Sequence, residues 1–236
     1  MDNHNITAVW QQVVGTQPDP PRWLVLACAA AALLAILPHP VWRVSRNVVT
    51  IAHEGGHSLI ALLTGRRLDG VRLHSDTSGL TVSSGRPTGL GMILTAAAGY
   101  TAPSLLGLGG AALLAAGRIT ALLWISIALL AALLIMIRNA FGLLSVVATG
   151  AVFFAVSWFG SAQLQAGFAY LGIWFLLLAG VRPVIELQSK RRRGGARDSD
   201  ADQLARLTGV GALLWVTLFL VVALSCLLAG GSQLLR

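Results

Sequence analysis

Long apolar runs, separated by short polar segments, make up most of the chain. A bilayer core of about 30 Å requires about 20 apolar residues in a single helix. Seven runs are candidates for such helices: roughly 23–38, 43–64, 88–117, 119–137, 141–160, 164–183 and 207–230. The first run is short, and two of the later runs are closely joined. The pattern therefore predicts an all-α polytopic membrane protein with six or seven transmembrane helices.

One segment, residues 65–87, departs from this helical pattern. Apolar and polar residues alternate over 71–74 and again over 80–83, and turn-forming residues at 76–79 lie between them. Alternation with a period of two on both sides of a turn is typical of two paired strands. We therefore predict a short β-hairpin at 65–87, directly after the apolar run 43–64.

Composition supports a lipid environment. Hydrophobic residues make up 56% of the chain, charged residues make up only 11%, and the mean hydropathy is +0.75. Soluble domains carry about 25% charged residues, so this deficit indicates lipid rather than a large soluble core. We expect a multi-pass protein of the cell membrane, surrounded by the lipid bilayer. Cys28 and Cys226 lie inside apolar runs and are expected to be buried small hydrophobes rather than a disulfide.

The formal net charge of +8 does not indicate a nucleic-acid partner, because the basic residues lie between apolar blocks, where they determine topology. With segment 184–206 placed in the cytoplasm, 12 of the 17 basic residues fall on the inner side. They are Arg66, Arg67, Arg72, Arg86, Arg138, Arg182, Lys190, Arg191, Arg192, Arg193, Arg197 and Arg206; the other 5 are Arg22, Arg43, Arg46, Arg118 and Arg236. This bias predicts an outside N-terminus and a cytoplasmic 184–206 loop, although Arg43 and Arg46 count against it.

These boundaries divide the chain into four parts. Residues 1–22 are polar and rich in proline, and we expect a loosely ordered leader. Residues 23–183 form the transmembrane core, 184–206 the basic cytoplasmic loop, and 207–236 a C-terminal transmembrane helix. A signal peptide is an alternative interpretation of the first apolar run. The run KRRR at 190–193 either binds anionic lipid head groups or is a solvated cluster that only fixes topology.

Residues 49–63, VTIAHEGGHSLIALL, place an HExxH motif inside an apolar run. His53 and His57 stand one turn apart on one helix face, where both imidazoles can reach one Zn²⁺. Glu54 lies about 100° around the helix, where it can act as general base on a zinc-bound water. By chance the motif arises on the order of once in a thousand chains of this composition, and ionisable residues in a membrane helix indicate a functional site. The two glycines of the motif allow a neighbouring helix to approach closely.

Two histidines leave a catalytic zinc site one protein ligand short, because such sites normally have three. The sequence offers several donors for the third position: Glu186, Asp200, Asp202, His74 and Asn139. An aspartate of the DSDAD cluster at 198–202, just before the last apolar run, could swing into the bundle toward the metal. Alternatively, Ser199 or Asp200 serves only as the N-cap of the following helix.

The chain resembles the site-2 proteases, a family of intramembrane zinc metallopeptidases, and most closely a compact subgroup of peptidases similar to that family. The resemblance rests on an HExxH motif in an apolar run, on the hairpin after it, and on three longer stretches. These are TIAHEGGHSLIALLTGRRLDGVRLHSDTSGLTV at 50–82, AAGYTAPS at 97–104 and SDADQLARLTG at 199–209. The NxxPxxxLDG segment of the wider family is absent, and LDG at 68–70 is misplaced for it.

The resemblance implies a zinc metalloendopeptidase with His53, His57 and Asp200 as metal ligands and Glu54 as the general base. Its substrate would be a transmembrane protein or peptide, whose helix must unwind locally before its peptide bonds become accessible. The hairpin either accepts the unwound segment as an added strand or is only a connector at the membrane surface.

Two other functions fit the same residues. One is a non-catalytic, metal-binding membrane scaffold related to the site-2 proteases, which would not need Glu54. The other is a small transporter that uses the polar side chains as a proton or metal path. Transporters of this kind are often built from repeated halves, and the sequence shows no convincing internal repeat.

Overall fold

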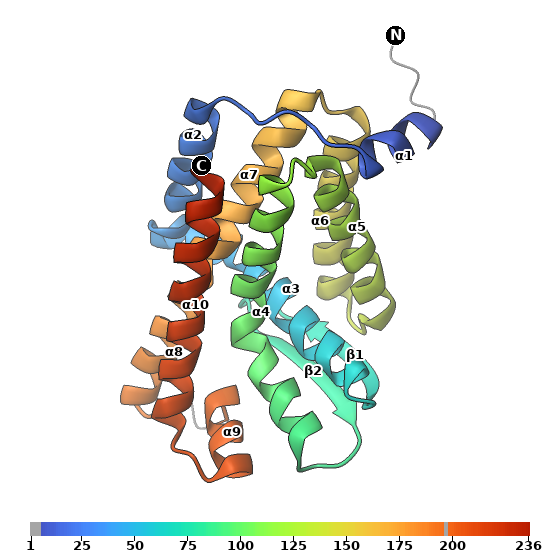
Figure 1. The fold of residues 1–236 in the computed structure, drawn as a ribbon. Coiled ribbons are helices and arrows are strands. Elements are labelled where there is room, and N and C mark those ends of the chain that lie inside the picture. The colour runs from blue at the N-terminus through green and yellow to red at the C-terminus, as the bar shows by residue number, and fades with distance from the viewer. Residues whose placement is uncertain (1–5, 196–197) are drawn as a thin grey trace.

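The computed structural model describes residues 6–195 and 198–236, and these form a helical bundle with one small sheet (Figure 1). Arg197, which the charge pattern placed in the cytoplasm, and Asp2 of the leader lie outside the described residues. The elements in chain order are α1 (Ile6–Val14), α2 (Arg22–Ile36), α3 (His39–Leu63), β1 (Arg67–Leu73), β2 (Gly79–Ser84), α4 (Leu90–Ala115), α5 (Ile119–Met136), α6 (Ala140–Phe159), α7 (Ala162–Ala179), α8 (Val181–Arg192), α9 (Asp200–Thr208) and α10 (Ala212–Leu234).

The predicted fold class is confirmed. Five helical segments of the described chain are long and apolar enough to cross a membrane: α4, α5, α6, α7 together with α8, and α10. The pair α2 and α3 passes the same test only when taken together, and it counts as a sixth crossing if the two helices form one span. The described chain therefore has five or six candidate crossings, at the lower end of the predicted six or seven.

The first two apolar runs form a sharply bent pair of helices instead of two separate crossings. Their helices, α2 and α3, meet at an angle of 105°. Pro38 is the N-cap of α3, and Pro40 lies in the first turn of α3. A proline has no N–H to donate, so these residues suit the start of α3 and do not extend α2. The break leaves the carbonyls of Ile36 and Leu37 without helical partners, and the guanidinium of Arg182 on α8 donates to both.

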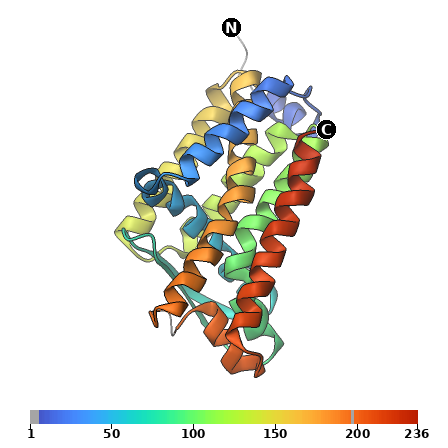
Figure 2. The same cartoon turned by 90° about the vertical axis from the view of Figure 1, so that its left-hand side faces the viewer.

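The first described helix, α1, and the C-terminal end of α10 lie at the same end of the bundle (Figures 1 and 2). The turn between α8 and α10, which contains α9, lies at the opposite end. Arg46, which the charge pattern assigned to the outer side, pairs with Glu186 of α8 at 3.5 Å. The end that faces the cytoplasm stays a prediction from the distribution of basic residues.

The segment 184–206, expected to be a loop, is largely helical. The helix α8 continues from α7 after Gly180 and extends to Arg192. Pro183 fits because it lies in the first turn of α8, where its missing N–H removes no helical hydrogen bond. The helix α9 begins after Ser199, whose side chain accepts from the Asp202 amide, and ends at Gly209 in the left-handed conformation. The charges that suggested a loop lie on helices at the end of the bundle.

The expected loosely ordered leader also contains structure. Its helix α1 is followed by a segment that is bonded to the turn between α4 and α5. The Gln17 amide donates to the Gly117 carbonyl at 2.8 Å, and its side chain accepts from the Thr120 amide at 3.1 Å. Arg118 donates to the carbonyls of Val14 and Gly15. These polar contacts explain why a proline-rich segment without a hydrophobic pattern takes a defined path.

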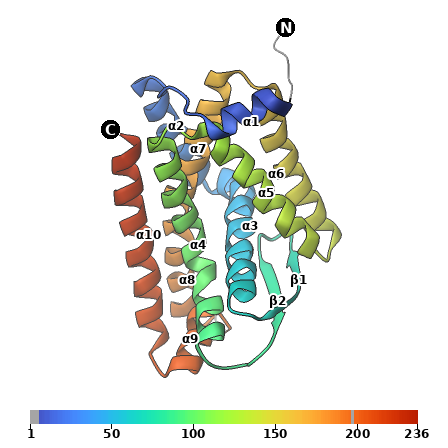
Figure 3. The same ribbon diagram turned by 45° about the vertical axis from the view of Figure 1, so that its right-hand side comes forward.

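The predicted hairpin is present, and only one of its edges is free. The strands β1 and β2 pair in antiparallel fashion, and they lie beside α3 (Figure 3). The other edge of β1 is occupied by the turn between α5 and α6. There the Arg138 amide donates to the Val71 carbonyl at 2.9 Å, and the Asn139 amide group donates to the Leu73 carbonyl at 2.7 Å. Within the described residues, no strand pairs with the outer edge of β2.

The core that holds the site joins α4 to its neighbours. A hydrophobic cluster of α2, α4, α5, α7 and α10 fills the half of the bundle near the termini, and Cys28 and Cys226 are buried in it as expected. A second cluster packs α9 between α4, α8 and α10. In this second cluster Ala201, Leu204 and Phe219 are fully buried, so α9 is firmly attached to the bundle.

The contact between α3 and α4 depends on Gly56. A Cβ atom at this position would collide with the Cβ of Ala102 and lie 3.0 Å from the carbonyl oxygen of Ala98. The neighbouring Gly55 has open space at the corresponding position. The sequence suggested close helix approach for both glycines, and the structure assigns it to Gly56 alone.

We expect Gly56→Ala to destabilise the protein by about 1–3 kcal/mol, because overpacking must separate α3 from α4. Gly55→Ala is the matched control and should be neutral or slightly stabilising, since alanine is the better helix former. Thermal unfolding in detergent micelles measures both. Equal unfolding temperatures for the two variants would contradict this account of the helix contact.

Candidate metal centre

The two histidines of the motif face each other's ring nitrogens on one side of α3. His53 and His57 are one turn apart, and their Nε2 atoms lie 3.1 Å from each other. Their rings meet edge to face, with the centroids 4.7 Å apart. The i, i+4 spacing therefore brings the two ring nitrogens as close together as binding to one metal ion requires.

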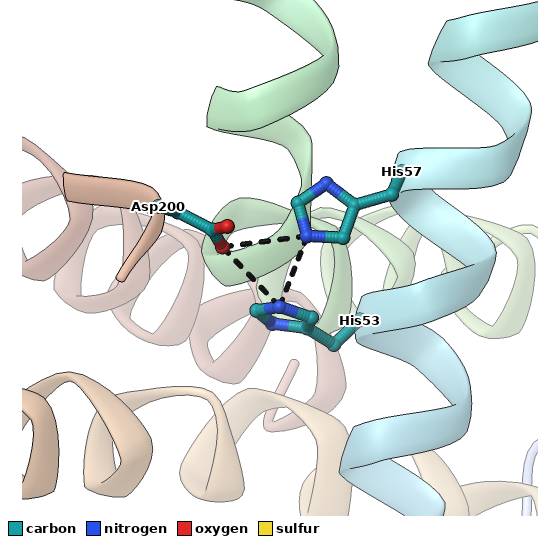
Figure 4. Close-up of side chains that lie close together, drawn as sticks. All are labelled: His53, His57 and Asp200. Atoms are coloured by element: carbon teal, nitrogen blue, oxygen red, sulfur yellow. Dashed lines mark hydrogen bonds and ion pairs between the residues drawn. The ribbon is translucent and has the colours of Figure 1, made fainter. Parts of the chain in front are cut away.

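Asp200 joins these histidines from the N-terminus of α9. Its Oδ2 atom lies 3.3 Å from Nε2 of His53 and 3.3 Å from Nε2 of His57 (Figure 4). Ser199 provides the N-cap of α9, so Asp200 in the first turn is not needed for that purpose. Ala201 and Leu204 are buried against α4, α8 and α10, and this packing directs the carboxylate of Asp200 toward α3.

The three donor atoms fit a tetrahedral metal ion. A zinc ion holds nitrogen and oxygen ligands at about 2.0–2.1 Å, and at tetrahedral angles neighbouring ligand atoms are then about 3.3 Å apart. The observed edges of 3.1, 3.3 and 3.3 Å match that triangle. The Asp200 Oδ2 atom is also buried and accepts no hydrogen bond from the described residues. A buried carboxylate oxygen in that state is suited to a cation. The residues therefore could hold a metal ion.

The ring of His57 is held by the backbone of α4. Its Nδ1 atom donates to the Thr95 carbonyl at 2.7 Å, so that Nε2 faces His53 and Asp200 and, in the neutral ring, can coordinate a metal. His53 is positioned by packing instead. The ring of Tyr100 on α4 meets it edge to face at 4.9 Å, and Tyr100 itself stacks on Phe219 of α10 at 5.3 Å.

Gly99 provides the space in which the donors meet. A Cβ atom there would lie 2.6 Å from Nε2 of His53 and even closer to Nε2 of His57. No side chain larger than hydrogen fits beside the two ring nitrogens. The α4 backbone therefore forms one wall of the centre.

The general-base candidate, Glu54, is buried beside the hairpin, with 4% of its surface exposed. The hydroxyl of Thr81 on β2 donates to its Oε2 atom at 2.6 Å. Gly79 on the same strand leaves room for the carboxylate, since a Cβ at that position would overlap it. The hairpin thus fixes the orientation of the only acid within the motif.

The other sequence candidates for the third position lie elsewhere. The side chain of Glu186 accepts from Trp42 at 2.8 Å and pairs with arginines of α3 and α8. Asp202 is bound by Arg191 and Ser199. His74 is exposed on the hairpin turn near Ser78, and Asn139 bonds the backbone of β1.

Electrostatics support an ionised Asp200. Burial by itself raises the pKa of its carboxyl, but the adjacent imidazoles of His57 and His53 outweigh burial and hold the pKa well below its usual range. The same direction applies to Asp202, where burial is outweighed by bonds from Ser199 and Arg191. Both groups at the start of α9 are therefore carboxylates at neutral pH, as a metal ligand must be.

Sequence reasoning missed the residues that shape this centre without coordinating. Thr95, Gly99, Gly79 and Thr81 contribute a carbonyl, a gap or a hydroxyl, and none of these contributions has a motif of its own. Gly99 does lie in AAGYTAPS, one of the stretches that carried the family resemblance. The hairpin residues lay in a segment whose fold was predicted and whose contact with Glu54 was not.

These features define a membrane-embedded helical protein with a candidate metal centre inside its bundle. A sequence model described as Peptidase M50B-like matches residues 26–230, and the chain belongs to this family of site-2 protease-like peptidases. Comparison with curated proteins and with solved structures gives no match. The resemblance read from the sequence is thereby confirmed at the level of the family.

We expect Gly99→Ala to weaken metal binding about 10–100-fold, because the added methyl group displaces both ring nitrogens while every donor remains. Gly109→Ala on the same helix has open space around it and should bind like the wild type. Zinc content after dialysis against a graded series of metal buffers measures the difference. Wild-type affinity in the Gly99 variant would show that the donors meet elsewhere.

Proposed function

We propose that this protein is an intramembrane zinc metalloprotease that hydrolyses a peptide bond of a membrane-embedded substrate. The observation that carries the proposal is the meeting of His53, His57 and Asp200 next to a buried glutamate from the same helix turn. Membership of the peptidase family supports the reaction class. Zn²⁺ is the metal that we propose, because two imidazoles and one carboxylate at tetrahedral spacing suit it.

In this proposal His53, His57 and Asp200 hold the metal, and Asp200 is the third ligand. When bound, Zn²⁺ would lower the pKa of water to about 7 and polarise the scissile carbonyl. The protein fixes the donors in advance through the Thr95 carbonyl and the buried packing of α9. Preorganised donors of this kind require no rearrangement during the reaction.

Glu54 acts as the general base and then as the general acid. Its carboxylate takes the proton from the attacking water and passes it to the leaving amine. The bond from Thr81 occupies Oε2 and restricts rotation of the carboxylate. A scaffold that only binds metal would have no use for a buried glutamate held in this way, so its contact with the hairpin favours hydrolysis over the binding-only alternative.

The substrate must offer an extended segment, because helical peptide bonds are hidden in their own hydrogen bonds and lipid provides no replacements. The outer edge of β2 can accept such a segment as an added strand. This position suits catalysis, since β2 is the strand whose Gly79 and Thr81 contact Glu54. The covered edge of β1 leaves β2 as the hairpin edge that can take the substrate.

We expect His57→Ala and Asp200→Ala each to lose most of the bound zinc, because each leaves only two protein ligands. His74→Ala removes an exposed histidine and should keep wild-type zinc. Metal analysis of the three purified proteins makes the comparison. Retention of zinc by Asp200→Ala would remove Asp200 from the ligand set.

Glu54→Gln should keep its zinc and lose activity by about 10²–10⁴-fold, because the amide cannot accept the proton. Cleavage of a library of fluorogenic peptides in micelles, with zinc content measured on the same sample, tests both halves. Wild-type rates in this variant would end the catalytic assignment. A wild type that binds zinc and cleaves no peptide would favour the scaffold.

A further inference from the structure

Residues of α8 and α10 line a groove. The two helices lie side by side toward the end of the bundle that contains α9 (Figures 1 and 2). The groove has a volume of about 290 Å³. Apolar side chains line most of it: Val184, Ile185, Leu213, Val216 and Leu220. Because α8 extends the α7 span and α10 is itself a candidate span, the groove lies between two helices that are long and apolar enough to cross a membrane.

The groove changes from apolar to basic along its length. Arg192 lines it at the end of α8, next to the polar side chains of Gln188 and Ser189. Two further basic residues, Lys190 and Arg193, are close to Arg192 in the sequence, and all three side chains are exposed. Among the described residues, no carboxylate pairs with these three basic side chains. The apolar groove thus ends at three basic side chains that have no carboxylate partner among the described residues.

We propose that this groove binds an anionic phospholipid of the adjacent leaflet, with an acyl chain along the apolar wall and the phosphate at Arg192 and its basic neighbours. The chemistry of the groove selects this occupant. A soluble phosphate would use only the basic end, and an acidic peptide would leave the apolar wall open to lipid. A phospholipid satisfies both parts, and basic pockets between membrane helices bind such head groups.

The site has a structural consequence for the metal centre, and this part rests on the proposed function. Arg191, between two basic residues of the cluster, forms an ion pair with Asp202 of α9. Val184 and Val216 of the groove belong to the same hydrophobic cluster that buries Leu204 of α9. A lipid in the groove would therefore stabilise the packing of α9, the helix that supplies Asp200.

The test is native mass spectrometry of the detergent-purified full chain, titrated with phosphatidylglycerol or with phosphatidylcholine. We expect the wild type to retain phosphatidylglycerol in preference. Arg192→Gln combined with Arg193→Gln should weaken that binding about thirtyfold, since each basic residue near an anionic surface contributes about a fivefold factor. The variant Thr217→Trp, which fills the groove without changing charge, should also lose the lipid.

Arg67→Gln combined with Arg72→Gln is the matched control, because it removes the same charge from exposed positions on the hairpin. This control should bind phosphatidylglycerol like the wild type. Equal loss in both double variants would reduce the effect to general surface attraction and overturn the proposal. Equal retention of phosphatidylcholine by the wild type, or unchanged binding in Thr217→Trp, would also overturn it.

Lipid binding and peptidase activity fail separately in these experiments. Wild-type lipid preference in Glu54→Gln would be expected even if the protein cleaves nothing. The link to α9 is read from zinc retention against a chelator in vesicles with and without phosphatidylglycerol. Slower zinc loss in the anionic vesicles is expected, and equal loss would remove the link.

Discussion

A polar centre inside a membrane protein can exist only if the protein itself supplies every partner, because lipid supplies none. In this chain the constraint is met by one close contact between α3 and α4. Gly56 lets the two backbones approach, and Gly99 leaves the space in which His53 and His57 turn their nitrogens toward each other. The Thr95 carbonyl from the same face of α4 then fixes His57. The donor geometry and the orientation of the rings follow from this contact.

The two acidic side chains of the site are held by different neighbours of that helix pair. Asp200 is brought by a short helix whose buried side is held between three neighbours, and Glu54 is held by a strand of the hairpin. Separate elements thus hold the proposed metal ligand, Asp200, and the proposed general base, Glu54. A change in the packing of α9 would act first on metal binding, and a change in β2 would act first on the Glu54 carboxylate. The two proposed roles could in this way be adjusted independently.

The parts that local pattern determines were predictable from the sequence. Hydrophobic run length gave the spans from α4 to α7, period-two alternation gave the hairpin, and i, i+4 spacing gave the histidine pair. The parts that depend on tertiary contacts were not. The break between α2 and α3 needs Arg182 to satisfy its carbonyls, and the helices within 184–206 need a packed partner for residues that appear merely charged. The residue pattern left five candidates for the third position, and the family resemblance alone selected Asp200; the packing of α9 against α4 brings it to the histidines.

One feature of the hairpin limits how the molecule can associate with itself. Because the segment around Asn139 already occupies the far side of β1, hydrogen bonding can extend this sheet in a single direction. Two molecules could join through their β2 strands, but a third would find no strand left to join. Self-assembly through this sheet therefore stops at a pair of molecules. The free edge of β2 cannot lead to open-ended aggregates in a crowded membrane.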